Sequence, residues 1–145
     1  MRVRLEVAGD ARALIDSLRR HGVACDAACK RVLSDAGDEA VRRAKPRTPV
    51  ELEDGGQLRD SVRRGRVTRI KSGTISCPVI AGGKPVEDWV REHGHHKYNV
   101  YAVVQHEDTT LRHSVGQAKF IESAVFEVAP TIPDRLLAAL PTEPS

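Results

Sequence analysis

The chain has 145 residues, of which 40% are hydrophobic and 30% are charged, and its net charge is +3. A chain of this length typically forms one domain and buries about two-thirds of the surface that its unfolded form exposes. No apolar run approaches the roughly 20 residues that span a bilayer, so we expect no membrane partner. We predict a single domain over residues 1–140 and a disordered tail over 141–145.

The charge is distributed unevenly along the chain. Residues 1–75 carry 17 Lys and Arg against 11 Asp and Glu, a balance of +6, whereas residues 76–145 carry 6 against 9, a balance of −3. Such asymmetry is typical of a nucleic-acid-binding face, and equally of complementary surfaces on neighbouring copies of one protein. We favour the second interpretation.

The three cysteines are Cys25, Cys29 and Cys77. An odd number, with an N-terminus that lacks the long apolar region of a signal peptide, predicts a protein made in a reducing cytoplasm. Cys25 and Cys29 are four residues apart, so a helix would place them on one face. We expect small buried thiols, and for Cys77 a place on an edge strand.

Hydrophobic periodicity predicts the elements of the first half. Alternation over residues 2–7 indicates a short strand, and Asp10 is a plausible cap for a helix that ends at Gly22. A longer helix is predicted from Asp26 to Ala44, because alanines recur every four residues along it. Pro46 and Pro49 are expected to prevent its continuation.

The second half is predicted to supply most of the strands. A loop over 46–57 contains an acidic trio, and strands are expected over 58–70 and 74–80. After a loop over 81–85 and an ambiguous stretch over 86–98, alternation predicts a further strand over 99–106. A polar loop then leads to a helix over 118–128, which Ala129-Pro130 should end, and to a last turn or two over 134–140. The expected fold is α+β, with an antiparallel sheet of about four strands packed against the long helix and the C-terminal helix.

The histidines offer one candidate for chemistry. Histidine nitrogens and carboxylates are good ligands for zinc or iron, and the sequence is rich in both between His93 and His113. The spacing fits no known metal motif, because His106-Glu107 is not followed by a second histidine at the required distance. We expect structural or solvated histidines, no cofactor and no catalytic residues. A metal-dependent hydrolase that uses the His93–His113 cluster remains an alternative.

A basic segment runs from Arg59 to Lys71, with six basic side chains opposed only by Asp60. Such density can bind phosphates, which leaves a small DNA-binding protein as a second alternative. The segment lacks the interleaved aromatic residues on which bases stack. We expect it to be a solvated or inter-subunit face.

Several elements in a fixed order resemble one family. They are Ala44-Lys45-Pro46-Arg47-Thr48-Pro49, Gly56-Gln57-Leu58-Arg59-Asp60-Ser61, Tyr101-Ala102 through His106-Glu107, and Gly116-Gln117-Ala118-Lys119-Phe120-Ile121-Glu122. Over roughly Ala40 to Val128 the chain resembles the head–tail joining, or tail-completion, proteins of long-tailed bacteriophages, also known as neck or minor capsid proteins. It departs from the usual pattern at Gly55-Gly56, where the family has Thr-Gly, and in an enlarged segment over 86–99.

The resemblance implies a structural virion protein, not an enzyme. Such proteins form rings, commonly hexamers, at the neck or tail end of the virion, after assembly in the bacterial cytoplasm. It implies as partners further copies of the chain, a head-completion (stopper) or connector protein and the major tail tube protein, with DNA passing through the lumen without specific binding. Whether the ring terminates the tail or joins it to the head stays open. The expected interaction residues are Glu51, Glu53, Asp54, Gln57, Arg59, Arg63, Arg64, Arg66, His106 and Glu107.

Overall fold

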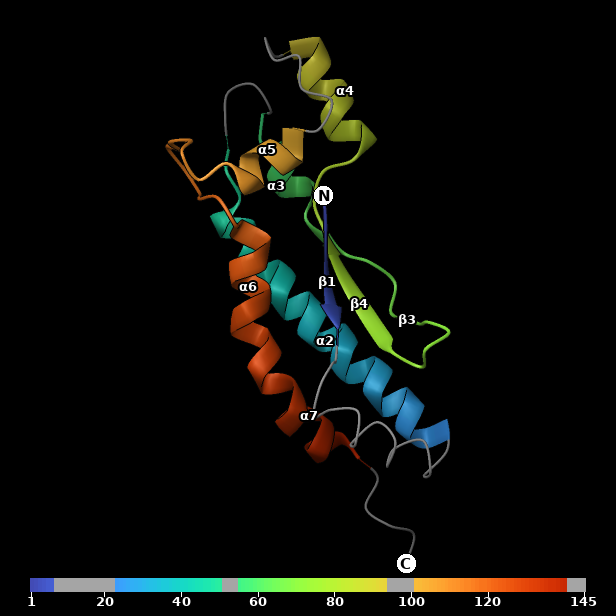
Figure 1. Ribbon diagram of the computed structural model, residues 1–145. Coiled ribbons are helices and arrows are strands. Elements are labelled where there is room, and N and C mark those ends of the chain that lie inside the picture. Colours follow the sequence, from blue (N-terminus) through green and yellow to red (C-terminus); the bar gives the residue numbers. More distant parts are fainter. Residues whose placement is uncertain (7–22, 51–54, 94–100, 141–145) are drawn as a thin grey trace, which may run out of the picture.

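A computed structural model describes residues 1–6, 23–50, 55–93 and 101–140 (Figure 1). The helix predicted over 10–22, the acidic trio Glu51, Glu53 and Asp54, the two histidines at 95 and 96 and the predicted tail at 141–145 lie outside these ranges. The described chain is α+β, as predicted.

The long helix α2 (Val23–Arg47) is the central element of the fold and contacts α6, α7 and β4. Its alanine stripe is buried, with Ala36, Ala40 and Ala44 each 0% exposed, because small side chains allow neighbouring elements to approach closely. The helix is longer than predicted and includes Pro46 in its last turn. The prediction that Pro46 ends the helix was wrong, since its missing N–H costs only one bond of the final turn.

The sheet is antiparallel and three strands wide. Strand β4 (Ile75–Ile80) lies in the centre and pairs along its length with β1 (Arg2–Glu6), with Arg2 opposite Ile80 and Glu6 opposite Ser76. The other edge of β4 is shared by two short segments, β2 (Arg63–Arg64) and β3 (Thr68–Arg69). Cys77 is therefore on the central strand and fully buried, and its predicted edge position was wrong.

Pro78 and Gly65 explain why this edge is divided. Pro78 lacks an N–H, but its carbonyl oxygen accepts a 2.7 Å bond from the Gly65 N–H between the two short segments. A Cβ on Gly65 would lie 2.6 Å from Pro78 Cγ, so the close approach requires glycine. The single strand predicted over 58–70 is thus replaced by β2, a break at Gly65, and β3.

The start of that predicted strand is instead a short helix, α3 (Gln57–Ser61). Gly56 precedes it with a φ of 84°, a left-handed conformation that glycine adopts without strain. Leu58 is completely buried and fixes the helix to the core. Val62, which follows the helix in an extended conformation, is also buried.

Helix α4 (Lys84–His93) occupies the stretch whose prediction was ambiguous, and it lies at the end of the molecule near α5 (Figure 1). Helix α5 (Tyr101–Glu107) replaces the strand predicted over 99–106, and that prediction was wrong. Its buried side chains are Tyr101, Ala102 and His106, which follow a helical spacing rather than alternation.

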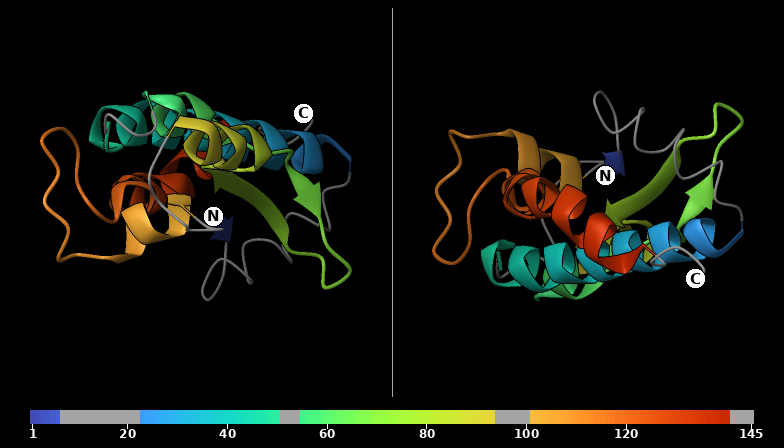
Figure 2. Two further views of the ribbon diagram at one scale, coloured as in Figure 1. Left: turned by 90° about the horizontal axis from the view of Figure 1, so that it is seen from above. Right: turned by 90° about the horizontal axis from the view of Figure 1, so that it is seen from below.

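The C-terminal part forms a nearly continuous helical rod. Helix α6 (Phe120–Val128) passes through a 3-10 turn, η1 (Ala129–Thr131), into α7 (Ile132–Ala139). The α-helix α6 thus ends before Ala129-Pro130, as predicted, and the 3-10 turn at these residues leads directly into α7. Figure 2 shows the rod lying along α2, and Ile121, Val125, Ile132 and Leu136 are buried at this contact.

Ion pairs line the contact between α2 and the rod. Glu127 accepts bonds from Arg43 and Arg47 at 3.0 and 2.8 Å, and Glu39 pairs with Arg43 and Arg135. Arg135 and Arg43 hold the pKa of the Glu39 carboxyl below its usual value. None of the helices in the described ranges combines the length and apolarity needed to cross a membrane.

Candidate interaction surfaces

His106 joins α5 to the start of α6. The imidazole is 1% exposed and packs edge-on against Phe120, with ring centroids 5.0 Å apart. Its Nε2 accepts the Glu122 N–H at 3.4 Å, and its Nδ1 is 2.7 Å from Glu107 Oε1. These partners require a neutral ring with the proton on Nδ1. His106 therefore caps α6 from another helix, since Lys119 at the N-cap makes no side-chain cap bond.

Charged side chains surround this junction. Glu107 pairs with Lys119, which is also 3.2 Å from Glu122. The Lys119 ammonium and the His106 ring hold the pKa of Glu107 below its usual value, whereas burial lowers the pKa of His106. The buried imidazole thus acts within the chain, and Glu107 is the member of the pair that a partner could reach.

The polar loop predicted after α5 is confirmed over residues 108–119 and is anchored to the end of α2. The Gln117 N–H donates to Arg47 O at 2.8 Å, and the Val50 N–H donates to Val115 O at 3.4 Å. Gly116 has a φ of 91°, and a Cβ there would lie within 2.5–2.7 Å of the backbone of residues 47–49. The loop backbone therefore rests directly on the chain that leaves α2.

The same loop presents apolar side chains to solvent. Leu111 and Val115 are 37% and 47% exposed, and Thr109, Thr110, Arg112 and Ser114 are exposed beside them. Figure 1 shows the loop projecting from the fold beyond the start of α6. Exposed apolar groups on an anchored loop are suited to docking against another protein. We name residues 108–117 the projecting loop.

Most arginines of the basic segment donate hydrogen bonds to other groups of the same chain. Arg59 Nη2 donates to Thr48 O at 3.2 Å, which places a cation at the negative end of the α2 dipole. Arg63 donates to Ser61 O and Gly82 O at 2.9 and 3.3 Å. Arg64 Nε donates to Asp38 at 2.8 Å, and this carboxylate raises the pKa of Arg64.

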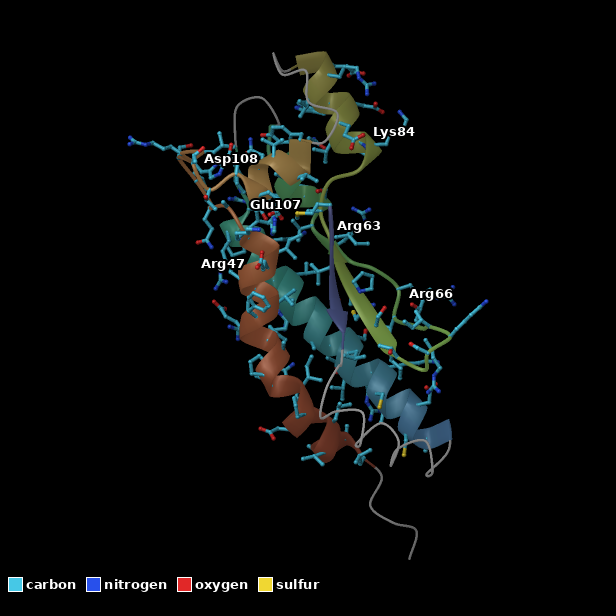
Figure 3. The ribbon with its side chains drawn as sticks, viewed as in Figure 1. Arg47, Arg63, Arg66, Lys84, Glu107 and Asp108 are labelled. Carbon is cyan, nitrogen blue, oxygen red and sulfur yellow. The ribbon has the colours of Figure 1, made fainter. Side chains whose placement is uncertain are left out.

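Three further basic residues of this segment lie around the turn from β3 to β4. Arg69 pairs with Asp26 on α2. Arg66 and Lys71 are exposed and make no ion pair within the described part of the chain. Figure 3 shows Arg63 and Arg66 on one side of the molecule and Arg47, Glu107 and Asp108 on the other. Of the predicted interaction residues, Arg63 and Arg66 therefore lie on a different surface from Glu107.

Gln57 is half-buried at the start of α3, near the C-terminal end of α2. Arg59 and Gln117 bind the adjacent carbonyls of Thr48 and Arg47, so this end of α2 joins α3 to the projecting loop. The interaction roles of the predicted residues stay predictions. Sequence reasoning missed Gly116 and Lys119 as anchors, although both lie in the Gly116–Glu122 element that it singled out.

The histidine cluster gains no support as a metal site from the described residues. Among them, no group of three or more His, Cys, Asp or Glu side chains is placed to hold a metal ion. Both ring nitrogens of His106 already bond within the chain, one to the Glu107 carboxylate and the other to the Glu122 N–H. The region around residues 95 and 96 lies outside the described ranges. Burial raises the pKa values of Cys29 and Cys77, which keeps these thiols protonated and unreactive.

One comparison with known proteins gives a match. A family model named HK97-gp10-like, with the description "Bacteriophage HK97-gp10, putative tail-component", matches residues 12–122. The matched range runs through α2, strands β2, β3 and β4, and α5, and it ends in the first turn of α6, so that β1 lies outside it. No curated protein and no solved structure matches the chain.

Proposed function

The chain belongs to the HK97-gp10-like family of phage tail components, and on this premise we propose that it forms a ring at the head–tail interface of a long-tailed bacteriophage. Its role there is structural, as a tail terminator or a joining protein, and not enzymatic. The observation that carries the proposal is the match over residues 12–122, which includes all four of the sequence elements that resemble neck proteins.

The projecting loop supports a docking role toward the head or the tail. It offers Leu111 and Val115 on a backbone that is fixed to the end of α2. A loop that is already ordered loses less conformational entropy on binding than a free segment does. We assign to it the contact with a head-completion or connector protein, or with the major tail tube protein.

The use of the arginines favours passage of DNA over binding of DNA. Arg59, Arg63 and Arg64 each donate to groups of their own chain. Affinity for DNA depends on the number of phosphates that free cations neutralise, so few free cations give weak binding. Weak binding of this kind is compatible with the passage of DNA through the ring.

Deletion of the gene from a phage that carries it tests the proposal. Electron micrographs of the lysate are expected to show DNA-filled heads beside unattached tails. Tails of normal length would identify a joining protein, and tails of uncontrolled length would identify a terminator. Intact infectious particles would contradict the proposal. The matched control is complementation by the wild-type gene in trans, which should restore plaques.

A further inference from the structure

An exposed apolar stripe runs along the outer face of the C-terminal rod. Phe126 and Leu137 are 66% and 59% exposed, the highest values among the large hydrophobic side chains of the described residues. Pro130 and Pro133 between them are also exposed. The four positions are spaced by four, three and four residues, the spacing that aligns side chains on one face of a helix. We name these four residues the outer stripe.

Core packing does not explain the outer stripe. The inward face of the rod carries Ile121, Val125, Ile132 and Leu136, all buried against α2 and its neighbours. Single exposed hydrophobic residues are ordinary, but an aligned row of them on one helical face is typical of an interaction site. The rod is therefore apolar on two faces, of which its own chain covers one.

A second exposed apolar surface lies at the turn between β3 and β4. Ile70 is 40% exposed. Its N–H donates to Thr74 O at 2.9 Å and its carbonyl accepts the Gly73 N–H at 2.8 Å, so the turn is already ordered. Arg66 and Lys71 are exposed on either side of it. We name residues 66–73 the basic turn.

The charges of the two surfaces are complementary. Residues 59–71 carry six basic side chains against one acidic side chain, whereas residues 120–140 carry three acidic side chains against one basic side chain. The basic member of the rod, Arg135, is turned inward onto Glu39, and Asp134 beside the outer stripe is exposed with no ion pair in the described part of the chain. Opposite free charges therefore flank the two apolar features.

The two surfaces also lie on opposite sides of the molecule. In Figure 1 the turn at β3 is at one edge and the α6–α7 rod is at the other, with α2 and the sheet between them. A copy cannot satisfy both features internally, but the turn of one copy can reach the stripe of the next. Such a contact joins unlike faces, and repeating it generates a ring when the rotation closes.

We infer that the outer stripe of one copy binds the basic turn of a second copy, with Ile70 packed on the stripe between Phe126 and Leu137 and with Lys71 and Arg66 near Asp134. This inference rests on the proposed function, since it names the contact that builds the assembly. It assigns the partner as the same chain and leaves the projecting loop free for head or tail proteins.

Complementation between two variants tests the inference. Phe126→Asp places a charge on the outer stripe and leaves the basic turn unchanged, whereas Ile70→Asp places a charge on the basic turn and leaves the outer stripe unchanged. Each variant alone is expected to weaken self-association by at least about tenfold, since a central apolar anchor commonly contributes that much. Mixed in equal amounts, the two variants retain one good contact per pair and are expected to form dimers and nothing larger. Sedimentation velocity of the full chain measures these masses.

The controls separate folding from contact. All substituted side chains are exposed, and circular dichroism checks that each variant is folded. Leu137→Asp repeats the test on the same stripe. Pro85→Asp places the same charge on an exposed apolar position of α4, away from both surfaces, and should assemble as the wild type does.

Four results would overturn the inference. The first is that both variants assemble like the wild type, and the second is that the mixture of the two variants stays monomeric. The third is that Phe126→Asp loses assembly while Ile70→Asp assembles like the wild type, which would indicate that the stripe pairs with itself or with another segment. The fourth is a wild-type chain that is monomeric at all concentrations. The deletion experiment in phage tests the virion role independently of each of these results.

Discussion

The buried imidazole of His106 shows how one residue couples two elements. Its ring accepts the Glu122 N–H while its other nitrogen faces Glu107, so α5 and α6 share one polar group in an apolar setting. A buried polar group stabilises a fold only when its bonds are satisfied. The protonation state of this ring therefore affects the stability of the whole chain.

We predict that stability falls as the pH decreases through about 6.5. Burial lowers the pKa of His106 from 6.5, so the unfolded chain binds the proton more tightly than the folded chain does. The free energy of unfolding, measured with urea, should fall between pH 7.5 and 5.5. This range stays above the usual pKa of Glu107, whose lowered value would matter only in stronger acid.

His106→Gln is the matched variant for this prediction. Its amide can accept one bond and donate another without titrating. It should cost about 1 kcal/mol at pH 7.5, through an imperfect cap, and should show a flatter dependence on pH. Equal losses in both proteins between the two pH values would assign the effect to other groups.

Gly116 fixes the projecting loop, and a second glycine provides its control. We predict that Gly116→Ala destabilises the chain by roughly 2–4 kcal/mol, because it adds left-handed strain and a clash with the backbone after α2. Gly56 has a similar φ of 84° but has no atom within 4 Å of a Cβ, so Gly56→Ala should cost only about 1–2 kcal/mol. Equal losses of unfolding free energy would show that the clash is relieved elsewhere.

At the scale of elements, local patterns predicted some parts and failed at others for identifiable reasons. The alanine repeat of α2 was predictable, because it buries the one face that the helical period specifies. Strand β4 was predictable as a short apolar run, and it is buried on both faces at five of its six positions. Tyr101 to His106 reads as a strand because its residues alternate, yet its buried residues Tyr101, Ala102 and His106 lie on a helix. The break at Gly65 depends on Pro78, which is distant in sequence and invisible to local reasoning.

The close contact between Gly65 and Pro78 leads to a prediction about the sheet. Gly65→Ala should cost about 1–3 kcal/mol, because the new Cβ meets the rigid Pro78 ring at 2.6 Å. In a chain that also carries Pro78→Ala the same change should cost less, since the ring is gone. A double-mutant cycle from urea unfolding measures this coupling. Strictly additive losses would mean that Pro78 is not the obstacle.

At the scale of the whole molecule, the matched family range and the folding unit differ. The match ends at residue 122, but the core continues through α7, where Ile132 and Leu136 are 5% and 3% exposed. The candidate sites were only partly predictable from the sequence. Sequence analysis identified the charged residues and the histidines as candidates, whereas the outer stripe is recognisable only when the buried face of the rod is known.

Truncation tests whether α7 belongs to the core. A chain ending at Thr131 loses two buried aliphatic side chains and the Arg135–Glu39 pair, and each buried aliphatic group contributes about 2–5 kcal/mol. Natural domains are stable by only about 5–15 kcal/mol, so this chain should be largely unfolded at 25 °C by circular dichroism. A chain ending at Leu140 keeps every buried residue of the rod and should retain the full-length unfolding midpoint. An unchanged midpoint for the shorter chain would instead make α7 an appendage, and Pro133 and Leu137, its half of the outer stripe, could then not be held at a fixed position for a neighbouring copy.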